Sequence, residues 1–384
     1  MRRLLLFVII ALLAPSAAAS AAAPPQIVVA APTIAFPDRI TFAATVTADQ
    51  PVTRITIEYG VRQLTCGTVS ARAFPSFTPG KRAEASWTWE MRRSGSVPPG
   101  ATIWYRWVVT AADGSQTRSP EQTLLWLDKD HAWRSRTAAG ITLHWYEGTD
   151  RFGKELLDSA VTSLAALKKT TGVAPDAPVD VYIYASTDDM RAAVLYEPGW
   201  TGGLAYAPFH SVIIGIGPDD LAWGKRTIAH ELTHVLVGQL TFSCIVNIPT
   251  WLNEGIAVYG EGGPEASSLA EFKAAVAQDR LLPVRTLSGN FSQDPGRADL
   301  SYSQSFSLVN YLVRSGGTAK LLALFAKLRD GVSIDPALQA VYGYDLDTFE
   351  ASWRESIGAK PRAGGRPIAT PRPSPVPTYV PLAP

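Results

Sequence analysis

The segment from Thr227 to Tyr259 holds His230-Glu231-Leu232-Thr233-His234 and, further on, Trp251-Leu252-Asn253-Glu254-Gly255. Apolar residues around the two histidines recur at helical spacing, so the imidazoles lie one turn apart on one face of a predicted helix. At that separation both can bind one Zn²⁺, and Glu231 can reach a metal-bound water without being a ligand itself. A third ligand from Glu254 leaves the fourth position open, as catalytic zinc requires. This segment predicts a zinc hydrolase.

The second motif is predicted to lie on a helix of its own. Pro249 and Thr250 open this helix, with Thr250 as its N-cap, which places Glu254 in the first turns. The metal helix itself is expected to begin near Asp219 or Asp220 and to end near Gly238. A surface helix that carries two ordinary histidines is the alternative, but it leaves the second motif without an explanation.

Together the two motifs resemble those of the gluzincin metallopeptidases. Within that group they are similar to the bacterial peptidase MA-like domain proteins, distant relatives of thermolysin and of the M1 aminopeptidases. The resemblance extends over residues 140–357 in organisation and is specific only at the motifs. It implies an upper α/β subdomain that ends in the metal helix, a lower helical subdomain, and a cleft between them. It also implies that His230, His234 and Glu254 bind one zinc ion and that Glu231 is the general base.

Tyr302 precedes a predicted helix at residues 303–314 and resembles the tyrosine that donates a hydrogen bond to the oxyanion in M1-type gluzincins. A tyrosine that packs on the core is the equal alternative. The sequence departs from thermolysin-like relatives at Val258, where an aspartate orients a histidine in that family. Each ligand histidine still needs an acceptor for its second nitrogen, and the sequence does not identify one.

The segment Gly203-Leu204-Ala205 is predicted to bind substrate. Its place along the chain is that of an edge strand, which can pair with an extended peptide through backbone hydrogen bonds. No Gly-x-Met-Glu-Asn pattern, the exopeptidase signature of aminopeptidases, is present. We therefore expect an endopeptidase.

The N-terminal segment, residues 1–23, is typical of a signal peptide. Arg2 and Arg3 precede an apolar run from Leu4 to Leu13, and small residues with Ala-x-Ala cleavage sites follow. The apolar run is short for a membrane span, so cleavage is favoured over an uncleaved anchor. We expect a secreted or extracytoplasmic protein with no integral membrane span after cleavage.

Residues 26–128 show alternating apolar and polar positions in short runs that are separated by turn signals. This pattern is typical of an antiparallel β-sandwich of the immunoglobulin or fibronectin type III kind. Its tryptophans are expected to pack in the core or across strands rather than to form a ligand-binding face.

The fold class is therefore multidomain, with an N-terminal antiparallel β-sandwich followed by an α+β zincin-type metallopeptidase domain. That domain is predicted at residues 140–358, with an α/β upper subdomain at 140–238 and a helical lower subdomain at 249–358. A polar link is expected at about residues 128–139. Residues 360–384 are rich in proline and are expected to form an extended or disordered tail.

The composition and net charge argue against some other classes of function. The 384 residues are 46% hydrophobic and 18% charged, with a formal net charge of +1, so no nucleic-acid surface is indicated. Cys66 and Cys244 are the two cysteines. In an oxidising compartment they can form a disulfide, and two separate buried thiols are the alternative.

The sequence thus predicts an exported zinc peptidase that acts on peptide or protein substrates. The rival interpretation is a cell-surface binding or scaffold protein with a vestigial zinc hydrolase domain. A zinc hydrolase that acts on a non-peptide amide is a third hypothesis.

Overall fold

The structure is a computed structural model that describes residues 23–94, 97–195, 202–292 and 294–362. The predicted signal segment, apart from Ala23, and the tail from residue 363 onward lie outside the described residues. The chain forms two compact units. The β unit comprises residues up to 60 together with 70–90 and 103–124. The α/β unit comprises residues 61–69, 91–102 and 125 onward. None of the described helices is long and apolar enough to span a membrane.

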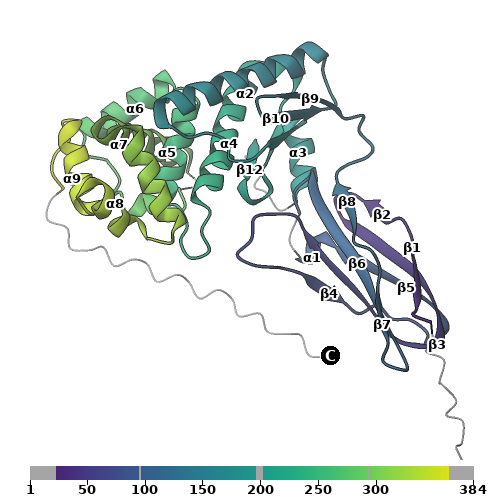
Figure 1. The fold of residues 1–384 in the computed structure, drawn as a ribbon. Helices are drawn as coiled ribbons and strands as arrows, with labels where there is room; N and C mark the ends of the chain where they lie inside the picture. The colour runs from purple at the N-terminus through teal and green to yellow at the C-terminus, as the bar shows by residue number, and fades with distance from the viewer. Residues whose placement is uncertain (1–22, 95–96, 196–201, 293, 363–384) are drawn as a thin grey trace, which may run out of the picture. The chain divides into compact units, whose positions relative to one another are not determined.

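The N-terminal region is built on one long strand, and its strands join a single eight-stranded sheet (Figure 1). β3 pairs antiparallel with β1, β2, β4 and β5, and β6 pairs antiparallel with β7. The elements are β1 Gln26–Val29, β2 Thr33–Ala35, β3 Arg39–Val61, β4 Ala71–Ala73, β5 Gly80–Glu90, α1 Met91–Ser94, β6 Ala101–Ala111, β7 Gln116–Arg118 and β8 Gln122–Trp126. The predicted antiparallel β-structure is confirmed here.

Aromatic side chains hold the β unit together. Phe42 of β3 packs on Tyr105 of β6, with ring centroids 4.7 Å apart, and Trp107 is fully buried. Trp87 packs against both Phe42 and Tyr59. The expectation that the tryptophans serve packing is confirmed at these positions, because large rings that bury against each other supply most of the apolar area of a small domain.

The α/β unit begins with a five-stranded sheet in the order β12-β13-β11-β10-β9. Its strands are β9 Arg134–Ala138, β10 Ile141–Trp145, β11 Val179–Tyr184, β12 Gly203–Tyr206 and β13 Ser211–Gly215. The three central strands are parallel, and the two edge strands are antiparallel to their neighbours. The predicted polar link at residues 128–139 is wrong in part, because Arg134–Ala138 pairs with β10 as an edge strand.

Helices α2 Asp150–Thr171, α3 Thr187–Val194 and α4 Leu221–Thr241 accompany this sheet. α2 lies against β9, β10 and α4 (Figure 1). It is capped by Thr149 and ends at Gly172, which has a φ of 79° that favours glycine. The helix expected to start near Asp219 or Asp220 begins at Leu221, after a 3₁₀ turn over Pro218–Asp220, and continues past Gly238 to Thr241.

The rest of the described chain is helical, as predicted. Its elements are α5 Thr250–Gly260, α6 Ala266–Ala277, α7 Pro295–Arg329, α8 Ile334–Tyr342 and α9 Leu346–Ser356. Two details differ from the sequence prediction. Pro249, not Thr250, occupies the N-cap of α5. α7 contains the helix expected at 303–314 and continues to Arg329 across a non-helical residue, Gly317.

Cys66 and Cys244 are joined by a disulfide in the structure, with Cα atoms 5.5 Å apart. Both cysteines belong to the α/β unit, because residues 61–69 are part of it. The same segment is held by a backbone hydrogen bond in which Leu64 N–H donates to the carbonyl of Pro208. A loop between two strands of the N-terminal sheet is therefore a structural part of the α/β unit.

Glu58 is the buried charge of the β unit, with a residue exposure of 4%. Burial raises its pKa, but hydrogen bonds from Arg106 and Arg72 outweigh burial and lower the pKa below its usual value. The Nε atoms of the two arginines lie 2.7 and 2.9 Å from its carboxylate oxygens. A carboxyl whose pKa is lowered on folding stabilises the protein above its unfolded-state pKa, and this contribution is lost as the pH falls through the folded-state pKa.

We expect Glu58→Gln to destabilise the β unit at pH 7 by about 1–2 kcal/mol, since both arginines remain partly solvated. The difference from the wild type should shrink as the pH is lowered from 7 to 3, because protonation of the wild-type carboxyl removes the same ion pairs. Urea unfolding followed by tryptophan fluorescence at the two pH values measures this. An equal difference at both pH values would contradict the ion-pair explanation.

Candidate metal centre and cleft

Three side chains from two helices converge in the α/β unit. His230 and His234 lie on α4 and Glu254 lies on α5, and their ligand atoms are all within 4.8 Å of one another. The two Nε2 atoms are 3.0 Å apart, and they lie 3.4 and 3.3 Å from Glu254 Oε2. Ligand atoms of a tetrahedral zinc are separated by roughly 3.3–3.5 Å, given bonds of about 2.0–2.1 Å. The spacing in this structure fits such an ion.

The buried polar atoms of the group support the same fit. Glu254 Oε2, which faces both imidazoles, has no hydrogen-bond partner among the described residues. Burial raises the pKa of Glu254, but the facing charges of His234 and His230 lower it well below its usual range. When both histidines are neutral, as zinc ligands are, this buried carboxylate needs a positive charge where the three groups meet, and a divalent cation would supply it.

Two close helix contacts place Glu254. A Cβ on Gly255 would overlap the backbone oxygen of Ser305 on α7, and one on Gly260 would overlap the Thr233 hydroxyl on α4. α5 is therefore packed tightly against both neighbours, at sites five residues apart. This double contact aims Glu254 between α4 and α7 and leaves no room for a larger residue at either glycine.

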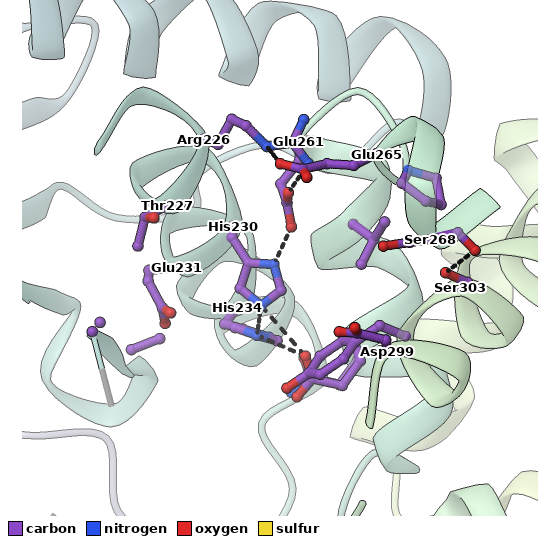
Figure 2. Close-up of a pocket in the computed structure, with 18 of the residues that line it drawn as sticks. Arg226, Thr227, His230, Glu231, His234, Glu261, Glu265, Ser268, Asp299 and Ser303 are labelled. Atoms are coloured by element: carbon purple, nitrogen blue, oxygen red, sulfur yellow. Dashed lines mark hydrogen bonds and ion pairs between the residues drawn. The ribbon is translucent and has the colours of Figure 1, made fainter. Parts of the chain in front are cut away.

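Glu261 supplies the acceptor that the sequence did not identify. His230 Nδ1–H donates to Glu261 Oε1 at 2.6 Å (Figure 2). Nε2 of the same ring then faces Glu254 and His234. Arg226 in turn donates from Nη2 to Glu261 Oε2 at 2.7 Å. Burial lowers the pKa of His230, but the carboxylates of Glu254 and Glu261 raise it to about 10. The expected position for such an acid holds Val258 instead, which is buried.

A signal for Glu261 exists in the sequence. It follows Glu254 by seven residues, which is two helical turns, so both acids lie on one face of α5 and its C-cap. That spacing differs from the four-residue spacing of thermolysin-like relatives, and a search restricted to the family pattern therefore misses it.

The remaining side chains of the site line a cleft with a volume of about 900 Å³. Glu231 and Tyr302 both line it, as do Gly203, Leu204 and Ala205 of the edge strand β12. Burial raises the pKa of the Glu231 carboxyl, although the nearby histidines oppose this. Burial and the surrounding carboxylates of Glu254 and Glu231 raise the pKa of Tyr302, so its hydroxyl keeps its proton.

β12 approaches the metal helix closely. A Cβ on Gly203 would lie 3.0 Å from Glu231 Oε1, and one on Gly202 would lie 2.8 Å from the Trp223 ring. Trp223, Thr227 and Glu231 follow one another at four-residue intervals, so they form one stripe of α4 along this strand. All three line the cleft, and Trp223 is 44% exposed.

The family model of the Peptidase MA superfamily matches residues 159–359, just over half of the chain. The chain belongs to this superfamily. The match covers the metal helix, the helix of Glu254 and Tyr302, and it confirms the resemblance to the peptidase MA-like proteins.

Several solved structures are similar to this chain at low identity and low TM-score. OgpA from Akkermansia muciniphila is 14% identical over 27% of this chain and 28% of its own length, with a TM-score of 0.22. An M1 zinc metallopeptidase from Deinococcus radiodurans is 13% identical over 87% of this chain and 94% of its own, with a TM-score of 0.37. Aminopeptidase A from Legionella pneumophila is 13% identical over 82% and 47%, with a TM-score of 0.35. No curated protein sequence matches the chain.

We expect Glu261→Ala to lower zinc affinity by about 10- to 100-fold, because His230 then loses the acceptor that fixes its ring and its tautomer. Competition with a chromogenic chelator measures this without any substrate. Glu265→Ala is the matched control, since Glu265 is 64% exposed and lies 3.6 Å from Arg226 without touching a histidine. Equal zinc affinity in the two variants would remove the positioning role of Glu261.

Proposed function

We propose that this chain is an exported zinc-dependent endopeptidase. The observation that carries the proposal is the convergence of His230, His234 and Glu254 beside Glu231, inside a cleft that has an edge strand along one side. Membership of the Peptidase MA superfamily supports peptidase activity. The N-terminal signal-like segment supports export, and a disulfide agrees with an oxidising compartment.

The site is organised for attack by water on a carbonyl. A zinc ion held by His230, His234 and Glu254 would polarise the carbonyl and lower the pKa of the attacking water. Glu231 accepts the proton of that water and then delivers it to the leaving amine. Its raised pKa suits both steps, because the carboxyl must take up a proton and release it within one turnover.

Tyr302 is proposed as the donor to the oxyanion that forms during attack. It lies on α7, in the eighth position of that helix, and its ring is 6.2 Å from that of His230. A hydroxyl that stays protonated can stabilise developing negative charge, and in a buried site such a donor is worth about 10²–10³ in kcat.

The substrate is proposed to pair with β12. Among the described strands, β12 pairs with β13 alone, so its outer backbone groups can add an extended peptide to the sheet. Gly203 permits the close approach of this strand to Glu231, which brings a paired peptide bond to the base. The cleft continues past Glu231 to Trp223, and this length favours a bond inside a peptide over one at its end.

In this proposal the N-terminal region is an accessory β-domain of the immunoglobulin or fibronectin type III kind, and the catalytic domain is of the zincin type. Polypeptide is the proposed substrate, and one zinc ion is the proposed cofactor.

Two variants test the reaction. Glu231→Gln should retain one equivalent of zinc and lose at least about 10³-fold in the rate of casein or quenched-peptide cleavage, since the base is removed and the ligands remain. Glu254→Ala should lose zinc, as measured by elemental analysis after dialysis. A Glu231→Gln protein that holds zinc and cleaves at the wild-type rate would refute the mechanism. A wild type that binds zinc but cleaves only non-peptide amides would refute the substrate class.

Tyr302→Phe should lower kcat by about 10²–10³-fold with little change in KM or zinc content, because the donor acts on the transition state. Tyr259→Phe is the matched control, since Tyr259 is a half-buried tyrosine of α5 that packs on Phe306. If the two variants have the same kcat, Tyr302 is a packing residue, as the alternative sequence interpretation holds.

A further inference from the structure

The β unit carries a basic hollow on one face of its sheet. The hollow has a volume of about 310 Å³ and is lined by side chains of β3, β6 and β7 and of the segment that contains β4. Its cations are Arg54, Arg72 and Arg118, with Arg106 beside them at a neighbouring outward position of β6. All lining residues belong to the β unit, so the hollow is separate from the metal cleft.

Alternation along the strands explains why these groups gather. Residues two apart point to the same face of a strand, so Arg54, Thr56 and Glu58 of β3 share one face. In the register of the sheet Glu58 pairs with Arg72 of β4, and Val108 of β6 pairs with Arg118 of β7. Four adjacent strands thus present arginines to one surface, with about 14 Å between the outer strands.

Glu58 holds two arginines of the hollow in fixed positions. This carboxylate is 4% exposed and engages the Nε atoms of Arg72 and Arg106, together with Nη2 of Arg72. A guanidinium has five N–H donors, so each arginine is held in place while other donors stay available. Immobilised donors bind a ligand at a lower entropic cost than free ones.

The hollow has an excess of positive charge. Arg54 and Arg118 are exposed and have no acidic partner among the described residues. Glu58 is the one acidic residue among the residues that line the hollow, and it contacts Arg72 and Arg106. All four cations are arginines, whose planar fork matches carboxylate and sulfate groups with two parallel hydrogen bonds. An anionic ligand is therefore favoured.

Neutral groups indicate which anion fits. Thr56, Thr110 and Gln116 line the same hollow and offer hydroxyl and amide groups. Phe74 lies at its edge with 69% of its surface exposed, which is unusual for so large an apolar ring. Hydroxyls, amides and a flat aromatic face are the groups that contact sugar hydroxyls and the apolar face of a sugar ring.

The floor of the hollow argues against a peptide. β3 and β6 are central strands whose backbone groups are used by neighbouring strands. An extended peptide bound over β3 and β6 has no free strand edge to pair with. Edge pairing is the main source of affinity for extended peptides. We propose that this face of the β unit binds an acidic polysaccharide, with carboxylate or sulfate groups on the arginines and a sugar ring on Phe74.

The test uses the full chain and isothermal titration calorimetry. The probes are oligogalacturonate, which carries carboxylates, a heparin oligosaccharide, which carries sulfates, and poly-glutamate, which carries carboxylates without sugar. We expect the wild type to bind at least one glycan, with an affinity that falls as salt rises. Whichever glycan binds identifies the anionic group.

The double variant Arg54→Gln/Arg118→Gln should weaken glycan binding at least ten-fold. Lys81→Gln/Arg82→Gln is the matched control, because it removes the same charge from exposed positions of β5 outside the hollow. That control should change the affinity less than two-fold. Phe74→Ala should weaken glycan binding and leave any binding of poly-glutamate unchanged. Peptide cleavage should be the same in all variants.

Three results would overturn the proposal. The first is no binding of either glycan by the wild type. The second is an equal loss in the two double variants, which indicates a general charge effect. The third is binding of poly-glutamate that is as tight as that of the glycans and insensitive to Phe74→Ala, which indicates an acidic peptide as the ligand.

Discussion

The close packing of α5 between α4 and α7 is the constraint on which the candidate site depends. At Gly260 this helix meets a hydroxyl of α4, and at Gly255 it meets the backbone of α7. Neither partner can move far, because Thr233 Oγ1 donates to the carbonyl of Ala229 and the Ser305 atom is backbone. The position of Glu254 relative to the histidines is therefore set by three rigid helices.

Electrostatics adds a second condition to this packing. Glu231, Glu254 and Glu261 bring three carboxylates close to two imidazoles, and Arg226 balances only the outermost acid. Like charges in a site of low polarity repel strongly unless a cation lies among them. A bound divalent ion would offset this repulsion, so metal binding would stabilise the α4–α5 pair.

The sequence was sufficient for the parts of the site that follow from short-range periodicity. His230 and His234 are one turn apart on any helix, and an acid on the next helix completes a known ligand set. Glu261 was not predicted because the family pattern places the supporting acid at position 258, four residues after Glu254. In this chain the acid lies seven residues after Glu254. The strand at Arg134–Ala138 was not predicted from the sequence, because its polar residues lack the apolar alternation that is typical of a strand. Membership of residues 61–69 in the α/β unit depends on contacts far apart in the sequence, which no local pattern encodes.

The segment that carries Cys66 has a consequence for how this protein can be divided. The α/β unit is assembled from three stretches of chain, and two of them, 61–69 and 91–102, lie between strands of the N-terminal sheet. A cut at residue 125 would place Cys66 on one piece and Cys244 on the other, and the two pieces would stay joined through the disulfide. The α/β unit is therefore not formed by one continuous stretch of the chain. A chain that begins at residue 125 would therefore lack residues 61–69 and 91–102 of the α/β unit.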